Sequence, residues 1–265
     1  FPCTKSLVGC HNHPHAQSIS EAIKYSCNPY YYYLVKKIIQ QGKNKNKKED
    51  AAYGLKKWTK YMHSFGLGVR LDSDIYGIRS GLIPTVSFYD KWYGKNRWSF
   101  STIRSISIGQ GEVKLTPLQM ANIAVIIANK GWFYTPHFVK NSTYKKNKTG
   151  IDKKHFIPVI DGMKKVINET GGTARLARID GVSICGKTGT VQNPHGKDHS
   201  VFIAFAPVEK PKIAIAVFIE NSGFGGTWAA PTASLMIEKY LTNKILDKEK
   251  EARILNANLL NNNNK

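Results

Sequence analysis

Residues 185 to 190 combine a cation, two hydroxyls and two glycines on a segment predicted to be a β-strand. They read Cys185-Gly186-Lys187-Thr188-Gly189-Thr190. Lys187 offers a positive charge to a carboxylate, and the hydroxyls of Thr188 and Thr190 can donate hydrogen bonds to the same group. Gly189 has no side chain, so an extended peptide could lie against this edge and pair with its backbone. The segment is therefore a candidate binding strand for a peptide carboxylate.

A second polar group, Ser26-Cys27-Asn28, stands at a turn between two predicted helices. Ser-x-Asn sequences are common as helix caps, because both side chains bond readily to nearby backbone groups. The turn is separated from Lys187 by more than half of the chain. Whether it does chemistry depends on the motifs that surround it.

Three of the four cysteines fall in the first 27 residues, beside three histidines. Cys3, Cys10 and Cys27 with one imidazole would form a common ligand set for structural zinc. His13 is the preferred nitrogen ligand, and His11 is the alternative. A Cys3–Cys10 disulfide and unconnected thiols are the rival interpretations. The sequence leaves all three open.

The formal net charge of +21 and the pI near 9.8 raise the question of a nucleic-acid partner. The lysines are spread over helices and loops, and no zinc-finger, RNP or helix-turn-helix pattern accompanies them. A coding bias toward Lys, Asn, Ile and Tyr explains the excess, so we expect no nucleic-acid partner. Attraction to an anionic membrane surface or cell-wall polymer is a weaker alternative.

The elements that must position these groups follow from periodicity and from capping signals. Helices are predicted over 18–41 with a break at residues 26–29, and over 51–64, 117–129, 155–169 and 230–241. Residues 69–105 are predicted to be an irregular excursion. Strands are predicted over 183–190, 200–208 and 213–221, and residues 245–265 form a charged, Asn-rich tail that we expect to be disordered. Helices, then an antiparallel strand set, then a closing helix indicate an α+β fold.

The chain resembles class B penicillin-binding proteins, and among them the penicillin-binding protein 2 group of peptidoglycan D,D-transpeptidases. Lys187-Thr188-Gly189 and Ser26-Cys27-Asn28 match two of the three signatures of that fold. Further matches follow in family order: Phe65–Gly68, Gly81–Pro84, Ile108–Glu112, Thr116–Ala121, Gly171–Ala174, Asp198-His199 and Phe205–Pro207. The resemblance extends from residue 3 to about residue 241.

This resemblance implies a serine β-lactamase/transpeptidase-like fold, with an antiparallel sheet covered by helices and a helical subdomain. Residues 1–244 would be the transpeptidase domain without its N-terminal part. Ser26 would relay protons to a leaving amine, Asn28 would hold the substrate amide, and Lys187 would bind its carboxylate. Thr188, Gly189 and Thr190 would bind substrate, with the Thr190 N–H as an oxyanion-hole donor. Catalysis would need no cofactor.

One departure concerns the nucleophile, which the family carries in a Ser-x-x-Lys motif N-terminal to Ser-x-Asn. The only match here, Ser142-Thr143-Tyr144-Lys145, follows Ser-x-Asn and lies in a Lys/Asn-rich segment predicted to be a surface loop. Nucleophile and lysine must be neighbours at i and i+3 on a helix. We therefore expect the nucleophile upstream of Phe1, and we expect this chain alone to perform no acyl transfer.

The resemblance also implies partners and a location. Stem peptides would be the substrates, β-lactams the inhibitors, and a polytopic membrane glycosyltransferase the expected protein partner. A single-pass anchor upstream would hold the domain at the periplasmic face of the bacterial inner membrane. Some family members have a small zinc site behind the Ser-x-Asn turn. A β-lactamase or β-lactam sensor of the same fold is the alternative function, and a non-catalytic binding module is another.

Overall fold

The computed structural model describes residues 8–140 and 143–259. The chain divides into two compact units, which we describe separately. Unit 1 comprises residues 1–16, 27–119 and 131–151, and unit 2 comprises residues 17–26, 120–130 and 152–265. One point of division lies within helix α6 (Pro117–Ala128), between Gln119 and Met120. In the described part of the chain, no helix combines the length and apolarity that a membrane span requires.

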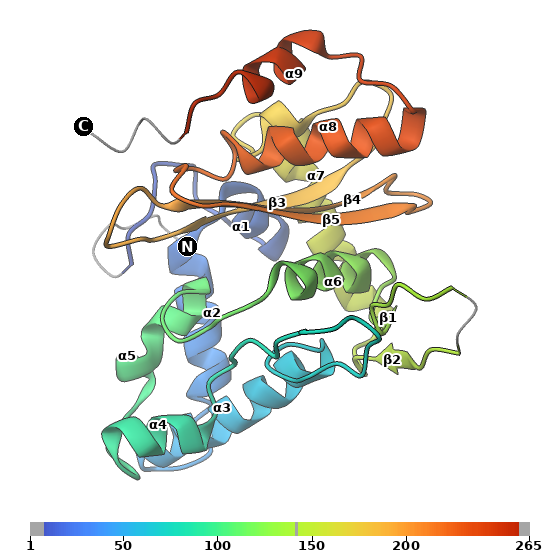
Figure 1. The fold of residues 1–265 in the computed structure, drawn as a ribbon. Coiled ribbons are helices and arrows are strands. Elements are labelled where there is room, and N and C mark those ends of the chain that lie inside the picture. The colour runs from blue at the N-terminus through green and yellow to red at the C-terminus, as the bar shows by residue number, and fades with distance from the viewer. Residues whose placement is uncertain (1–7, 141–142, 260–265) are drawn as a thin grey trace. The chain divides into compact units, whose positions relative to one another are not determined.

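Unit 1 is mainly helical (Figure 1). Its helices are α2 (Asn28–Ile39), α3 (Lys47–Ser64), α4 (Val86–Tyr93) and α5 (Phe100–Ile103), followed by the 3-10 turn η1 (Arg104–Ile108). The α2 and α3 helices approach closely at Gly54, where a Cβ atom would lie 2.1 Å from the carbonyl oxygen of Ile39. Glycine is therefore required at this crossing.

The core of unit 1 joins α2 and α3 to the segment that follows them. Its buried members are Val35, Ile39, Ala51, Leu55, Tyr89, Trp98, Phe100, Ile103 and Ile106. Two of the large side chains keep their polar atoms satisfied, since the Trp98 ring N–H donates to Asp90 at 2.8 Å and the Tyr89 hydroxyl donates to Glu112 at 2.9 Å. Burying an aromatic side chain stabilises a fold by about 2–3 kcal/mol, provided its polar tip is paired.

A short antiparallel hairpin closes unit 1. It pairs β1 (Trp132–Tyr134) with β2 (Lys146–Lys148), so that Trp132 lies opposite Lys148 and Tyr134 opposite Lys146. Its inner face is covered, because Phe133 is buried and the Asn147 amide donates to Thr135.

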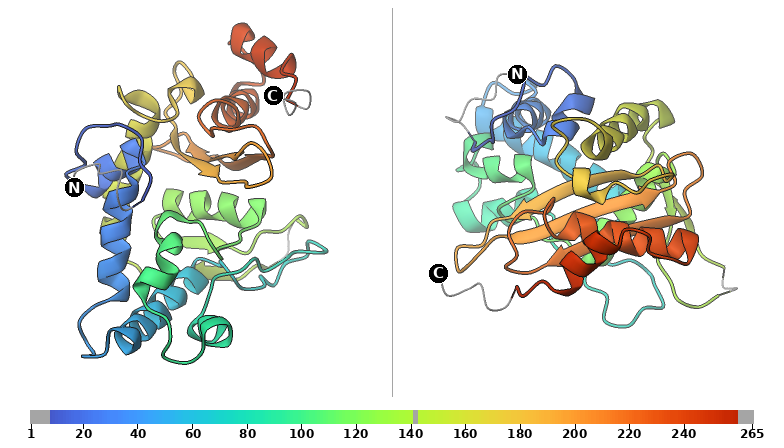
Figure 2. Two further views of the ribbon diagram at one scale, coloured as in Figure 1. Left: turned by 90° about the vertical axis from the view of Figure 1, so that its left-hand side faces the viewer. Right: turned by 90° about the horizontal axis from the view of Figure 1, so that it is seen from above.

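Unit 2 is built on a three-stranded antiparallel sheet in the order β3-β4-β5 (Figure 2). The strands are β3 (Cys185–Val191), β4 (His199–Ala206) and β5 (Ile213–Ile219). The middle strand reads as a nearly continuous apolar run because it is buried along almost its whole length. Gly189 faces Val201 in the register, and Lys187 faces Ile203.

The helices of unit 2 are α1 (Ile19–Tyr25), α7 (Ile157–Asn168), α8 (Ala229–Thr242) and α9 (Lys248–Leu255), with 3-10 turns η2 (Lys153–Phe156) and η3 (Arg175–Ala177). Helix α8 packs on β4 and β5, whereas α7 packs on β3 and on α1. In the view from above, α8 crosses the sheet while α7 lies beside it (Figure 2). This α1–α7–β3 stack is the frame of the site.

The predicted α+β fold is confirmed, and all three predicted strands form within two residues of their expected limits. The expectation of a disordered tail from residue 245 is wrong over Lys248–Leu255, which forms α9. Residues 69–105 are less irregular than expected, because they contain α4 and α5. Helix α3 begins at Lys47, four residues before its predicted start, since Asn46 caps it by accepting from the Lys48 N–H.

Candidate active site

The structure brings Ser26 and Lys187 together although 161 residues separate them in the sequence. Ser26 ends α1 in the left-handed region, with φ of 54°, and its N–H donates back to the carbonyls of Ala22 and Ile23. This cap turns the serine side chain out of the helix. The Lys187 ammonium donates to the Ser26 hydroxyl oxygen at 2.9 Å. A proton could pass directly between these two groups.

Lys187 lies in an environment that disfavours its charge. It is half-buried on β3, and its ammonium donates to the Thr188 carbonyl at 2.9 Å as well as to Ser26. Burial lowers the pKa of Lys187 to about 8. No carboxylate pairs with this lysine in the described part of the chain. A lysine with a lowered pKa can both attract an anion and exchange a proton near neutral pH.

The remaining predicted residues of this strand, Thr188, Gly189 and Thr190, are half-buried and lie on an edge strand of the sheet. Among the described strands, β3 pairs with β4 on one side and with none on the other. The hydroxyl oxygens of Thr188 and Thr173 lie 2.7 Å apart, which ties the strand to the segment before it. At Gly189 the loop after β5 approaches so closely that a Cβ on Gly225 would lie 2.4 Å from the Gly189 carbonyl. The open edge can accept an added peptide strand.

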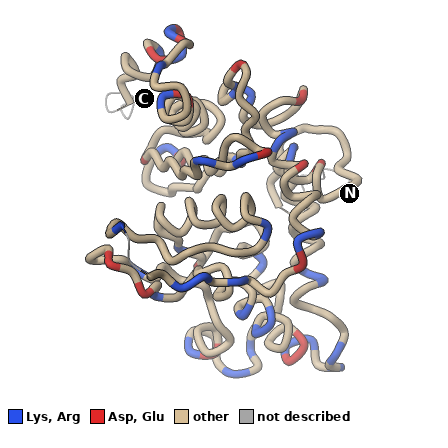
Figure 3. The backbone as a smooth tube through the Cα atoms, turned by 90° about the vertical axis from the view of Figure 1, so that its right-hand side faces the viewer, with Lys and Arg blue, Asp and Glu red and all other residues tan. Residues whose placement is uncertain are grey.

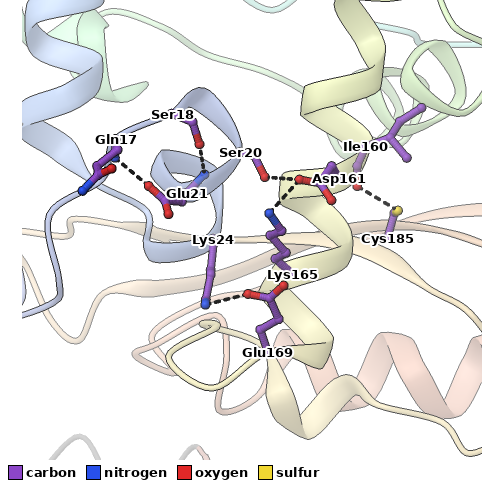
Figure 4. Close-up of polar contacts among 10 residues, drawn as sticks. All are labelled: Gln17, Ser18, Ser20, Glu21, Lys24, Ile160, Asp161, Lys165, Glu169 and Cys185. Carbon is purple, nitrogen blue, oxygen red and sulfur yellow. Dashed lines mark hydrogen bonds and ion pairs between the residues drawn. The ribbon is translucent and has the colours of Figure 1, made fainter.

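Two charged contacts hold the helix that carries Ser26 (Figure 4). The Ser20 hydroxyl donates to Asp161 of α7, and Asp161 also pairs with Lys165 at 2.8 Å. One turn further along, the Lys24 ammonium pairs with Glu169 at 2.7 Å. Lys24 is nearly buried, and this bond to Glu169 raises its pKa above the ordinary lysine value.

The same helix α7 also contacts the strand that carries Lys187. The Cys185 thiol donates to the Ile160 carbonyl at 3.4 Å, and burial raises the pKa of this thiol to about 12. Cys185 is therefore an inert packing residue. On the other side of α7, a Cβ at Gly162 would lie 2.8 Å from the Ser20 carbonyl oxygen. Helix α7 thus sets the distance between Ser26 and Lys187.

Asn28 opens α2 and belongs to unit 1. Its side-chain amide donates to the Gly9 carbonyl, so it links the start of α2 to the segment before α1. Neighbouring Cys27 is completely buried and is the N-cap residue of α2. The Asn28 amide and the Cys27 thiol therefore both face the segment that carries Gly9 and Cys10.

The predicted metal ligands Cys10, His13 and Cys27 converge within unit 1, where their ligand atoms all lie within 4.8 Å of one another. The Cys10 sulfur lies 3.2 Å from Nε2 of His13, while His13 Nδ1 donates to the Pro14 carbonyl at 2.6 Å. Tetrahedral zinc would require ligand separations of about 3.6–3.8 Å, from bond lengths of about 2.1 and 2.3 Å. The bond from Nδ1 leaves Nε2 to face a metal. The thiol and imidazole donors converge and are of the types that bind zinc, but the Cys10–His13 separation of 3.2 Å is shorter than a zinc-bound pair requires. Cys3, the fourth predicted ligand, lies outside the described residues.

Several residues that position the site could not be identified from the sequence. Asp161 in α7 and Glu169 at its C-cap are eight residues apart, but nothing in the sequence indicates that they meet α1. Thr173 belongs to the Gly171–Ala174 motif, and its hydroxyl could have been proposed from that match. Ser142, the weak alternative nucleophile, lies outside the described residues.

A match to the family described as the penicillin binding protein transpeptidase domain covers residues 4–238. The peptidoglycan D,D-transpeptidase MrdA of Haemophilus influenzae is 31% identical over 225 residues, which is 74% of this chain and 34% of that protein. The MrdA protein of Acinetobacter baumannii is 31% identical over 254 residues, which is 86% of this chain and 35% of that protein. The chain therefore spans about a third of the length of these curated relatives.

Solved structures of penicillin-binding proteins are similar to this chain as well. The crystal structure of Pseudomonas aeruginosa PBP2 in complex with WCK 5153 superimposes with a TM-score of 0.68 at 28% identity, over 88% of this chain and 48% of that one. The complex of PBP2 and MreC from Helicobacter pylori gives a TM-score of 0.70 at 25% identity, over 84% of this chain and 40% of that one. The expected family is confirmed, and the chain belongs to the penicillin-binding protein transpeptidase domain family.

Proposed function

We propose that the protein to which this chain belongs is a peptidoglycan D,D-transpeptidase that cross-links stem peptides during cell-wall elongation. The contact between Lys187 and Ser26 carries the proposal. It joins the Lys-Thr-Gly strand to the Ser-x-Asn turn at 2.9 Å, which is the pairing that proton relay requires. The relatives named peptidoglycan D,D-transpeptidase support the same reaction.

In this proposal a serine in a Ser-x-x-Lys motif N-terminal to Ser26 attacks the penultimate D-Ala carbonyl of a donor stem peptide. The serine gives its hydroxyl proton to the lysine of its motif as the acyl–serine bond forms, the C–N bond to the terminal D-Ala breaks, and Ser26 passes a proton to the leaving amine. A second stem peptide then attacks the ester through its own amine, which restores the serine. Lys187 holds the substrate carboxylate and exchanges protons with Ser26.

The donor peptide would lie along the free edge of β3. Thr188 and Thr190 would donate to its carboxylate, and the Thr190 N–H would donate to the oxyanion. Gly189 leaves the edge clear of side chains. Asn28 would hold the amide of the peptide. β-Lactams would acylate the same serine because they present a strained amide and a carboxylate in this arrangement.

We further propose that Cys10, His13 and Cys27, together with Cys3, hold a structural zinc ion. Such an ion would brace the start of α2 beside the Ser-x-Asn turn and would take no part in acyl transfer. The convergence of the three described ligands supports it. A Cys3–Cys10 disulfide is the competing outcome, and metal analysis separates the two.

The proposed setting is the periplasmic face of the bacterial inner membrane, with a polytopic glycosyltransferase as partner. One similar structure concerns the coordination of polymerization and crosslinking by a peptidoglycan synthase complex, and another holds Helicobacter pylori PBP2 with MreC. These relatives support an assembly in which glycan synthesis and cross-linking occur together.

The test is to incubate penicillin with this chain and with the protein extended upstream, and to weigh both intact. An adduct on the extended protein alone supports the proposal and the upstream nucleophile. An adduct on this chain would require a serine such as Ser142 or Ser26 instead. Rapid release of the adduct by hydrolysis would favour a β-lactamase, and no adduct on either would favour a non-catalytic binding module.

A further inference from the structure

We propose that a cationic groove in unit 1 binds uncross-linked peptidoglycan strands through the carboxylates of their stem peptides, at a place separate from Lys187. The proposal rests on the transpeptidase function proposed above. It supplies a holding site for the polymer, in addition to the strand edge that binds one reacting peptide.

The positive charge of the chain is concentrated in unit 1. Unit 1 contains 21 Lys and Arg against 6 Asp and Glu, whereas unit 2 contains 18 against 12. The ion pairs of the described residues all lie in unit 2. A general coding bias toward lysine would not by itself produce this difference between the units. Figure 3 marks the charged positions along the backbone.

Three of the six carboxylates of unit 1 are buried or half-buried, and none of the six forms an ion pair in the described part of the chain. Asp50 accepts the N–H groups of Gly42 and Lys43, which cap the turn before α3. Asp90 and Glu112 accept from Trp98 and Tyr89 in the core. The lysines and arginines on this unit therefore present an uncompensated field, which attracts polyanions.

The groove lies between residues 63–74 and the β1–β2 hairpin, with a volume of about 990 Å³. Its basic lining residues are His63, Arg70, Lys145, Lys146 and Lys148. Most of its other lining residues are polar, with hydroxyls and amides that can bond to sugars and peptide groups. Residues 131–151 contain no Asp or Glu. An anionic polymer rich in hydroxyl and amide groups fits this lining better than a lipid tail does.

Two carboxylates, Asp72 and Asp74, line the groove beside its four Lys and Arg residues, and Asp74 holds the groove wall in place. Asp74 accepts the N–H groups of Phe138 and Val139 and the Tyr144 hydroxyl, at 2.9, 2.7 and 2.9 Å. The bonds from these two backbone groups, that of Val139 first, hold the pKa of Asp74 below its usual range. The ionised Asp74 carboxylate thus holds Phe138, Val139 and Tyr144 in place, and its charge is stabilised by these three hydrogen bonds. On the other face, the Lys146 ammonium lies 3.8 Å from the centre of the Trp132 ring, which orders that side chain.

The experiment uses the intact protein and soluble glycan strands that carry uncross-linked stem peptides, with binding measured over a range of salt concentrations. The groove variant is Arg70→Gln, Lys145→Gln and Lys148→Gln combined. The matched control removes the same charge from exposed positions of α3, as Lys56→Gln, Lys57→Gln and Lys60→Gln. We expect the groove variant to bind about tenfold more weakly and the control to change by less than about threefold.

Several results would overturn the proposal. Wild-type binding in the groove variant, or equal loss in the control, would show that the groove has no special role. Equal binding of strands whose carboxylates are amidated would exclude charge recognition. Stronger binding of polyglutamate or of anionic phospholipid vesicles would assign the groove to an acidic protein or a lipid surface. Acylation by penicillin, measured on the same variants, should be unchanged, so a failure here is distinguishable from failure of the transpeptidase proposal.

Discussion

Replacing Lys187 with methionine should stabilise the folded protein at pH 7 while removing its activity. Burial lowers the pKa of Lys187 from its ordinary value near 10.4 to about 8. A pKa lower by one corresponds to about 1.4 kcal/mol, so the charged side chain destabilises the fold by about 3 kcal/mol at pH 7. Its hydrogen bonds to Ser26 and to the Thr188 carbonyl return about 1 kcal/mol each. The Lys187→Met variant should therefore gain about 1 kcal/mol.

The sign of the pH dependence follows from the same shift. Because the folded pKa lies below the unfolded pKa, the folded state binds fewer protons. The destabilisation is fully present below pH 8 and disappears as the pH rises from about 8 to about 10.4. Between pH 7 and pH 9.5 the advantage of Lys187→Met should shrink by about 2 kcal/mol, so that the wild-type protein becomes the more stable.

Urea unfolding of both proteins at the two pH values measures this difference directly. The Lys60→Met variant, altered at an exposed position of α3, is the control for the loss of one lysine away from the site. Two results would contradict the conclusion that burial of the charged Lys187 destabilises the fold. One is a Lys187→Met protein with a lower free energy of unfolding than the wild type at pH 7, and the other is a difference in this free energy that is the same at pH 9.5.

Three further changes test the positioning elements. Gly162→Ala places a Cβ 2.8 Å from the Ser20 carbonyl oxygen, so thermal unfolding should show a free energy of unfolding lower by about 1–2 kcal/mol, and penicillin acylation should slow. Unchanged stability and acylation would mean that α1 and α7 can move apart without cost. Glu169→Gln leaves the nearly buried Lys24 ammonium without its carboxylate, so the free energy of unfolding should fall by about 1 kcal/mol. An unchanged free energy of unfolding would mean that this ion pair does not stabilise the contact between α1 and α7. Cys27→Ser should lower bound zinc to a small fraction of one equivalent by elemental analysis, and full retention would exclude Cys27 as a ligand.

Much of the fold could be predicted because the signals were local. Thr116 before Pro117 predicts the start of α6, and the structure shows the Thr116 hydroxyl accepting from the Gln119 N–H at 3.2 Å. Strands β4 and β5 are mostly apolar runs joined by a turn that contains Pro211, and this local pattern predicts both strands.

The errors arose where tertiary contacts decide the structure. Helix α9 is polar and short, so its sequence alone predicts fraying. In the structure Asp247 caps it, the Lys250 ammonium donates to the Arg178 carbonyl, and the Arg253 guanidinium donates to the Thr227 carbonyl. Each of these contacts except the cap joins residues far apart in the chain.

In the candidate site, too, local signals could be predicted and tertiary contacts could not. Residue types predicted Ser26 and Lys187, and the family pattern implied that they act together. The sequence gives no means of finding the frame that sets their distance, because Asp161 and Glu169 are ordinary helix-surface carboxylates until α1 is placed against α7.

A double-mutant cycle tests directly whether Ser26 and Lys187 act as one unit in acyl transfer. The rate of penicillin acylation is measured for the intact wild-type protein, Ser26→Ala, Lys187→Met and the double variant. If the two groups form one relay, each single variant should lose about 10²-fold or more and the double variant should be scarcely slower than either. Wild-type acylation in either single variant, or losses that multiply in the double variant, would contradict the account.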